Sequence, residues 1–174
     1  GLIFKSMQKQ VDSIIVGGGL AGVLMAWELI KKGKKVMVFN SQALPSSSQV
    51  AAGTWNPIAF KQFCLSWRAE EMLAEMDLVY PELEKLLSAK FYQKTKVKKV
   101  ISEQNEINLW NKQALDETMQ HFLVEKLEAK NDGFLAEIKQ CGRVDLPLFL
   151  ADFHQYLKNE NSWAEEEFSY RDLH

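Results

Sequence analysis

The chain has 174 residues, of which 47% are hydrophobic and 25% charged, and its formal net charge is -2 at pH 7. This length suits one folded domain, or one domain and part of a second, and the composition excludes an intrinsically disordered chain. The nearly balanced charge supplies no positive field for phosphates, so we do not expect nucleic acid as a partner.

The cysteines and the apolar runs indicate a cytoplasmic protein. Cys64 and Cys141 are far apart with no second pair beside them, which argues against a disulfide framework and a zinc knuckle. The three histidines have no ligand-like spacing, so no metal site is expected. The longest apolar run, residues 14–27, is shorter than the ~18 residues that span a bilayer, and we expect no membrane partner.

Residues 11–39 predict a strand, a helix and a second strand. Residues 11–16 read V-D-S-I-I-V, a β-branched run that is typical of a buried parallel strand. From Leu20 the apolar residues recur at helical spacing, and Gly33 supplies a residue that commonly ends helices. Residues 36–39, V-M-V-F, predict the second buried strand. Together they form a βαβ unit with a right-handed crossover.

A glycine motif joins the first strand to the helix. It reads G-G-G-L-A-G and fits G-x-G-x-x-G in the strand, turn and helix context of a dinucleotide fingerprint. Gly17 makes the tight turn, Gly19 leaves room for a pyrophosphate, and Gly22 lets helix and strand pack closely. The backbone N–H groups of Leu20 and Ala21 then point at the phosphates from the helix N-terminus.

The ribose position departs from the usual pattern. An acidic residue that holds the adenosine ribose is expected about 20 positions after the third glycine. Asn40 stands there instead. An asparagine can hydrogen-bond the ribose hydroxyls but loses the charge-assisted bond of a carboxylate, a difference of ~1 kcal/mol.

The middle of the chain predicts a long loop followed by helices and a strand. Residues 41–57 are loop-like. Ser66 predicts the N-cap of a helix, and Pro81 should break that helix and start another. Residues 91–101 predict a strand, in which Lys94, Lys96 and Lys98 form a solvated or edge face.

The last third predicts two more strands and two helical segments. Residues 106–128 are expected to be mostly helical, and residues 134–140 form a strand after an Asn-Asp-Gly turn. Asp145 should cap the next helix, and residues 163–170 should form the last strand.

Two motifs together resemble a known family. Beyond the glycine turn, residues 46–57 read S-S-S-Q-V-A-A-G-T-W-N-P. The combination resembles the FAD-dependent oxidoreductases of the D-amino acid oxidase and glycine oxidase family. Residues 142–150, G-R-V-D-L-P-L-F-L, resemble the point where that family's chain returns from the substrate domain to the FAD domain. The resemblance implies a flavoprotein that binds FAD and oxidises a small amine or amino acid by hydride transfer to the flavin.

The resemblance also implies an organisation and a set of site residues. The fold class is α/β, with an incomplete Rossmann-like FAD-binding βαβ domain of residues 7–60 and 142–174. A partial α+β substrate domain covers residues 61–141. The residues assigned to the diphosphate, the ribose and the flavin are Gly17, Gly19, Leu20, Ala21, Gly22, Asn40, Ser41, Ser48, Ala51, Ala52, Gly53 and Thr54. No catalytic residue can be assigned.

The chain is short for this family, whose members are about twice as long, so it resembles an N-terminal half. A missing half would leave an apolar sheet edge and a helix face uncovered, including Leu148, Phe149 and Phe153. The partner that covers them is either a second copy of the chain or the missing C-terminal half.

Two other functions remain open. One is a catalytically silent nucleotide-binding subunit of a split oxidase, which the short length supports. The other is a nicotinamide-dependent dehydrogenase, against which Asn40 and the loop Ala51-Ala52-Gly53 argue.

Overall fold

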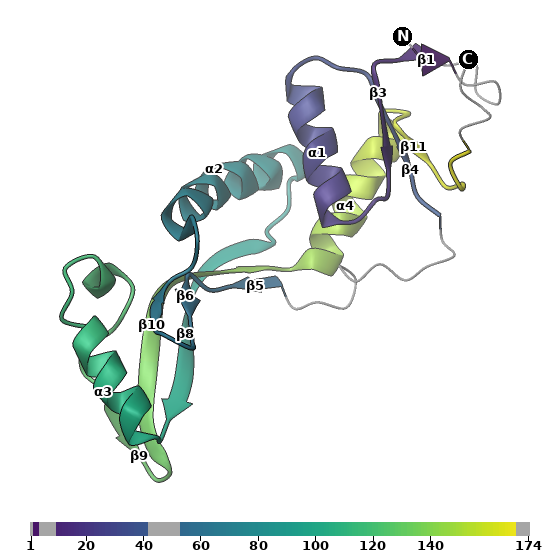
Figure 1. Ribbon diagram of the computed structural model, residues 1–174. Coiled ribbons are helices and arrows are strands. Elements are labelled where there is room, and N and C mark those ends of the chain that lie inside the picture. The colour runs from purple at the N-terminus through teal and green to yellow at the C-terminus, as the bar shows by residue number, and fades with distance from the viewer. Residues whose placement is uncertain (1, 4–9, 42–52, 170–174) are drawn as a thin grey trace. The chain divides into compact units, whose positions relative to one another are not determined.

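The computed structural model describes residues 2–3, 10–41 and 53–169 (Figure 1). Contacts divide the chain into two compact units: unit 1 is Gly1–Ala52 with Asp145–His174, and unit 2 is Gly53–Val144. The sequence predicted the domain boundaries between residues 60 and 61 and between residues 141 and 142, whereas the units change between Ala52 and Gly53 and between Val144 and Asp145. The assignment of FAD binding to one part and substrate binding to the other remains a prediction.

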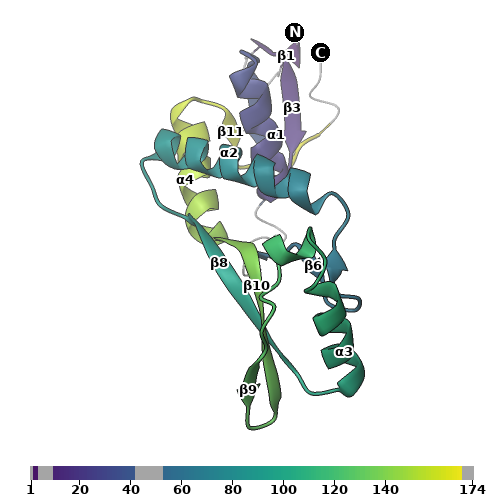
Figure 2. The same ribbon diagram turned by 90° about the vertical axis from the view of Figure 1, so that its left-hand side faces the viewer.

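Unit 1 is built on a three-stranded parallel sheet with the order β11-β4-β3. Its strands are β3 (Ser13–Val16), β4 (Val36–Phe39) and β11 (Trp163–Ala164). Helix α1 (Leu20–Lys31) contacts β3 and β4, and helix α4 (Leu146–Asn159) contacts β11 and α1 (Figures 1 and 2). Right-handed crossovers that advance in one direction across the sheet place both helices on one face.

The predicted βαβ unit is present, with boundaries close to those expected. The first predicted strand is divided into β2 (Gln10–Val11), which pairs with β1 (Leu2–Ile3), and β3. Helix α1 ends before Gly33, whose φ of 73° is the left-handed conformation that terminates helices. All four residues of β4 are buried, as expected for a central strand that is covered on both faces of the sheet.

Helix α4 begins where the sequence predicted, because the Asp145 side chain accepts a hydrogen bond from the Leu148 N–H at 3.2 Å. The expectation that its inner face is uncovered was wrong for Phe149 and Phe153, which are both 0% exposed, and only Leu148 is exposed. Phe153 packs edge-on against Trp27 of α1, with 6.5 Å between ring centroids. Aromatic side chains of unit 1 itself therefore fill this space.

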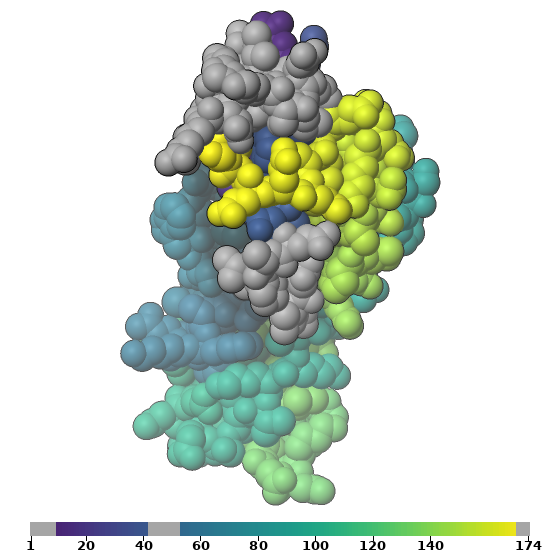
Figure 3. Space-filling view, turned by 90° about the vertical axis from the view of Figure 1, so that its right-hand side faces the viewer, coloured from purple at the N-terminus to yellow at the C-terminus, as the bar shows by residue number. Residues whose placement is uncertain are grey.

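The other face of the sheet is covered by the chain after β11. Phe168 packs edge-on against Phe39 with 5.2 Å between ring centroids, and Met37 and Ala164 belong to the same apolar cluster. Figure 3 shows the yellow segment after α4 lying over blue atoms from the early part of the chain. The last strand is shorter than predicted, because β11 ends at Ala164.

Unit 2 is built on an antiparallel sheet. Its strands are β5 (Gly53–Trp55), β8 (Tyr92–Ile101), β9 (Glu128–Lys130) and β10 (Gly133–Val144). The order is β5-β10-β8, and β9 forms a hairpin with the start of β10 (Figure 2). Two short strands, β6 (Ile58–Ala59) and β7 (Cys64–Leu65), pair with each other.

Helix α2 (Ala69–Leu87) corrects two predictions. Ser66 does not cap it, since Arg68 with a left-handed backbone at φ 54° precedes the first helical residue. Pro81 lies inside the helix without breaking it, although a proline there costs about 3 kcal/mol. Burial of Tyr80 and Leu83 on either side of Pro81 offsets that cost.

The stretch predicted to be mostly helical is helical only in α3 (Gln104–Gln113) and in the short 3-10 helix η2 (Met119–His121). Trp110 of α3 is fully buried, and its Nε1 donates to the Val124 carbonyl at 3.1 Å. Beyond η2, Leu123 forms a bridge to Ile138 of β10. Burial against the sheet therefore overrode the helical periodicity.

The lysines of β8 lie on an edge strand of this sheet, as the alternating pattern predicted. Lys94 pairs with Asp77 at 2.6 Å and Lys96 pairs with Glu137 at 2.7 Å. Lys98 lies 3.6 Å from the same Glu137. Carboxylates of unit 2 therefore neutralise these charges locally.

Candidate functional site

The glycine turn lies at the carboxyl end of β3, the edge at which open α/β sheets bind ligands. Gly17 has φ 108°, a conformation that favours glycine, and its N–H donates to the Phe39 carbonyl at 2.8 Å. A Cβ atom at Gly22 would lie 1.9 Å from the Gly17 carbonyl oxygen. Helix α1 can approach the turn this closely only because position 22 is glycine.

The start of α1 is suited to an anion. Gly19 is the N-cap residue with extended backbone, and no acidic residue lies in the first turn that follows it. The first N–H groups of a helix find no carbonyl within the helix, and they carry the positive end of its dipole. Leu20 and Ala21 occupy this first turn, as the fingerprint predicted.

Three side chains hold Gly18, the residue between the first two glycines of the fingerprint. Its N–H donates to Asn40 Oδ1 at 2.9 Å. Its carbonyl oxygen lies 2.6 Å from His154 Nε2, which must donate because a carbonyl only accepts. A Cβ atom at Gly18 would lie 2.4 Å from Cη2 of Trp163. The sequence singled out Asn40 as a ribose ligand but did not predict its bond to Gly18, and it assigned no site role to His154 or Trp163.

Asn40 follows β4, and its N–H donates to the Ala164 carbonyl at 2.9 Å. Because Gly18 occupies its side-chain oxygen, the amide NH2 of Asn40 is the group left for a ribose hydroxyl within the described part of the chain. An asparagine here can therefore support the turn and a ribose together.

The rings of His154 and Trp163 pack against each other in a tilted arrangement beside the turn. Their ring centroids are 4.2 Å apart with 34° between the planes. Burial lowers the pKa of His154, and the hydrogen bond to Gly18 acts in the opposite direction. Lys158, which pairs with Glu165 at 2.6 Å, lies over the Trp163 ring. Trp163 Nε1 is buried and has no acceptor among the described residues.

Three of the other predicted site residues, Ser41, Gly53 and Thr54, lie within the described part of the chain. Ser41 follows Asn40 and is exposed. Gly53 and Thr54 belong to β5 of unit 2, where Thr54 is exposed and pairs with Arg143 of β10. Ser48, Ala51 and Ala52 lie outside the described residues. The flavin contacts assigned to these residues remain predictions.

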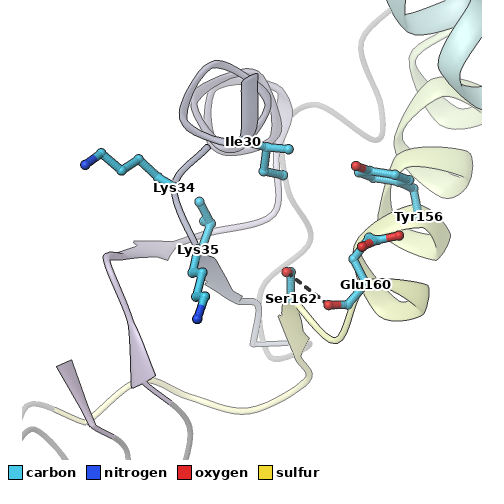
Figure 4. A pocket seen from close by; sticks show the side chains of 7 residues that line it. Ile30, Lys34, Lys35, Tyr156, Glu160 and Ser162 are labelled. Atoms are coloured by element: carbon cyan, nitrogen blue, oxygen red, sulfur yellow. Dashed lines mark hydrogen bonds between the residues drawn. The ribbon is translucent and has the colours of Figure 1, made fainter. Parts of the chain in front are cut away.

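A cavity of about 300 Å³ in unit 1 lies at the opposite edge of the sheet. Its lining residues are Ile30, Lys34, Lys35, Val36, Tyr156, Glu160 and Ser162. Figure 4 shows Tyr156 of α4 and Glu160, the residue after that helix, beside this space, and Ser162 Oγ donates to the Glu160 carbonyl at 3.4 Å. Because Val36 begins β4 and Ser162 precedes β11, the cavity marks the amino ends of the strands. It is therefore distinct from the glycine turn.

Metal and membrane features were also sought in the part of the chain that the structure describes. No three His, Cys, Asp or Glu residues among residues 10–41 and 53–169 are grouped so that they could hold a metal ion. None of the described helices combines the length and the apolar character needed to cross a membrane. Cys64 and Cys141 are free thiols.

Comparison with known proteins identifies the family. The profile of the DAO family, FAD dependent oxidoreductase, matches residues 12–153. The chain belongs to this family. The predicted α/β fold class, with its Rossmann-like βαβ unit, and the expected family are thereby confirmed, and FAD is the cofactor on which the family depends.

The chain is also similar to solved structures and to one curated protein. Glycine oxidase from Geobacillus kaustophilus superimposes with a TM-score of 0.68 at 19% identity, over 90% of this chain and 46% of that one. L-proline dehydrogenase from P. horikoshii gives 0.62 at 20% identity, over 90% and 44%. Thiamine thiazole synthase from Pyrococcus abyssi is 32% identical over 77 residues, which are 44% of this chain and 29% of that protein. The chain spans less than half the length of these proteins.

The residues of the turn fit an FAD diphosphate. The φ of 108° favours glycine at position 17, and a Cβ atom at position 22 would collide with the Gly17 carbonyl oxygen, so both positions require glycine. The α1 N-terminus brings a partial positive charge with no competing carboxylate. Residues Gly17 to Gly22 would therefore hold the diphosphate, and Asn40 would hold the ribose.

Proposed function

We propose that the chain supplies the dinucleotide-binding part of a flavoenzyme that oxidises a small amine or amino acid. The observation that carries the proposal is the fixed glycine turn at the carboxyl end of β3, in a chain that belongs to an FAD-dependent family. Glycine oxidase and L-proline dehydrogenase, two of the similar structures, are named for amino acids, which supports this substrate class.

The mechanism that we propose is hydride transfer. FAD, when bound, would supply the acceptor for the hydride that leaves the amine-bearing carbon of the substrate, while the nitrogen loses a proton and the amine becomes an imine. The task of this chain is orientation: the turn and the α1 N-terminus anchor the diphosphate, and Asn40 anchors the ribose. No side chain of this chain is assigned to the chemical step.

Cofactor analysis tests the proposal directly. The purified chain is heated, and the released small molecules are separated by chromatography. We expect FAD, because the family and the turn both favour it. Recovery of NAD would instead support the nicotinamide-dependent dehydrogenase and contradict the flavoenzyme.

Activity separates the flavoenzyme from a catalytically silent subunit. Peroxide release and dye reduction are measured with a panel of amino acids and amines as substrates. The protein is either the chain alone or the chain together with a C-terminal part that brings it to the length of a family member. That part is fused to the chain or added as a second polypeptide. Turnover that appears only with the added part supports the enzyme. Bound FAD without turnover under every condition would support the silent subunit.

Localisation and assembly belong to the same proposal. We place the protein in the cytoplasm, since both cysteines of the described residues are free thiols. Cell fractionation tests this placement. A small-molecule substrate is the main partner, and sedimentation with and without the C-terminal part distinguishes a homo-oligomer from an assembly of two halves.

A further inference from the structure

The peptide between Gly18 and Gly19 has a fixed orientation. Its carbonyl oxygen accepts a hydrogen bond from His154 Nε2 at 2.6 Å. Because a trans peptide is planar, its N–H points away from its C=O. The bond to α4 on one side therefore turns the Gly19 N–H to the opposite side.

The preceding peptide is fixed as well. The Gly18 N–H donates to Asn40 at 2.9 Å, and the Gly17 carbonyl faces Gly22, where a Cβ atom would lie only 1.9 Å away. Two consecutive peptides of the turn are thus held by side chains and by helix packing. Glycines lose more conformational freedom than other residues on ordering, so an unsupported run of three would sample many orientations.

Trp163 supports both partners of this contact. Its ring packs at a tilt of 34° against His154, with 4.2 Å between centroids, which limits rotation of the imidazole. The edge of the same ring packs on Gly18, where a Cβ atom would lie 2.4 and 2.8 Å from two ring carbons. This contact explains a glycine at position 18, which the dinucleotide fingerprint leaves unspecified.

We propose that His154 and Trp163 are positioning residues for the FAD diphosphate, which hold the Gly18–Gly19 peptide so that the turn presents its N–H groups to the phosphates. They come from α4 and β11, which follow unit 2 in the chain, and His154 is 136 positions from Gly18. The proposal rests on the proposed FAD-binding function. It adds two residues that neither the fingerprint nor the family resemblance assigns.

The hydrogen bond is tested with two substitutions at position 154. His154→Phe keeps a ring against Trp163 but removes the donor, and His154→Gln keeps an N–H donor. We measure the FAD dissociation constant by flavin fluorescence and the Gly18 and Gly19 amide shifts by NMR. Loss of one hydrogen bond predicts about five- to tenfold weaker FAD binding for the phenylalanine variant. The glutamine variant should recover to within about twofold.

His121→Gln is the matched control, because His121 is an exposed histidine of unit 2. It should change neither the FAD affinity nor the two amide shifts. A purely structural role of His154 would lower the melting temperature while the folded His154→Phe protein bound FAD as the parent does. That result would overturn the positioning role.

The Trp163 contact is tested by a double-mutant cycle. Gly18→Ala should weaken FAD binding by more than about tenfold in the parent chain, since the new methyl group meets the Trp163 ring. In a Trp163→Leu background the same change should cost less than about threefold. Equal costs in both backgrounds would contradict the role of Trp163.

The two levels of the proposal fail in different ways. If the parent chain binds no FAD, the proposed function is wrong and the positioning role falls with it. If the parent binds FAD and all the variants bind it equally well, only the positioning role is wrong.

Discussion

Units 1 and 2 use buried polar contacts for different purposes. In unit 1, Asn40 and His154 bond to the N–H and the carbonyl of one glycine in a turn. In unit 2, the buried Glu84 carboxylate accepts the N–H groups of Phe91 at 2.9 Å and Tyr92 at 3.2 Å. We propose that the first arrangement shapes a surface for FAD, whereas the second joins α2 to β8. A buried polar contact therefore indicates function only when the backbone that it fixes faces a binding site.

The largest effect is expected from Gly22→Ala. The new Cβ would lie 1.9 Å from the Gly17 carbonyl, a backbone atom that cannot rotate away, so α1 must move from the turn. We expect FAD binding to be lost and unit 1 to be destabilised by about 2–3 kcal/mol. Fluorescence titration with FAD and urea unfolding measure the two effects.

Gly33→Ala is the matched control at the other end of α1. Its φ of 73° makes alanine strained, at about 1 kcal/mol, but nothing lies within 4 Å of the added atom. Its FAD affinity should equal that of the parent. If Gly22→Ala also kept its affinity, the close approach of helix and turn would have no role in binding.

The next largest effect on stability is expected from the Glu84 contact that joins α2 to β8 in unit 2. Glu84→Ala leaves the Phe91 and Tyr92 N–H groups without their acceptor, and we expect a loss of about 2 kcal/mol in the free energy of unfolding. FAD affinity of the folded protein should not change, since this contact shapes no binding surface. Glu75→Ala, an exposed position on the same helix, controls for helix propensity. A weaker FAD affinity in Glu84→Ala would show that the unit 2 contact also affects binding, which contradicts the proposed difference between the two units.

Acid should weaken the two units in separate pH ranges. Burial lowers the pKa of His154 from 6.5, so the unfolded chain binds a proton more readily than the folded chain does, and stability falls as pH drops below about 6.5. Burial by itself would raise the pKa of Glu84, but the Tyr92 and Phe91 N–H groups and Lys90 outweigh it and lower this pKa from 4.5. The contribution of Glu84 is lost only below about pH 4.5.

Urea unfolding at pH 7.5 and pH 5.5 tests the assignment of the upper range. His154→Gln should reduce the difference in unfolding free energy between the two pH values, whereas His121→Gln should leave it unchanged. An unaltered difference in the His154→Gln protein would show that another group titrates in this range.

The smallest effect concerns the ribose. Asn40→Asp keeps an acceptor for the Gly18 N–H and adds charge-assisted bonds to the ribose hydroxyls, so FAD should bind about fivefold more tightly. Isothermal titration with FAD measures the gain, and Asn108→Asp, at an exposed position of α3 in unit 2, is the control. A weaker complex would indicate that the asparagine NH2 group donates to the ligand and cannot be replaced.

Several elements followed from short stretches of sequence. The glycine turn, α1, Gly33 and β4 were predicted within a residue or two, and so was the Asp145 cap of α4. Their signals are local, since a cap, a left-handed glycine or a period of 3.6 residues depends on neighbours within one or two turns.

Other features depended on distant partners. Helix α2 continues through Pro81 because Tyr80 and Leu83 are buried there, and the chain after α3 leaves the helix because Leu123 pairs with Ile138. No spacing within either segment reports those partners. For the contacts that His154 and Trp163 make with the turn, the sequence offered one signal, the extra glycine at position 18. A glycine there indicates that another group approaches the backbone closely, but it does not identify that group.

The sequence by itself therefore determined the βαβ unit, the glycine turn and the family, because these depend on adjacent residues with fixed spacing. Only the tertiary structure decided that His154 and Trp163 meet Gly18, since α4 and β11 reach the turn after the whole of unit 2 has intervened. The free energy of such contacts comes from packing between residues far apart in the chain, and packing of that kind leaves no periodic trace in the sequence.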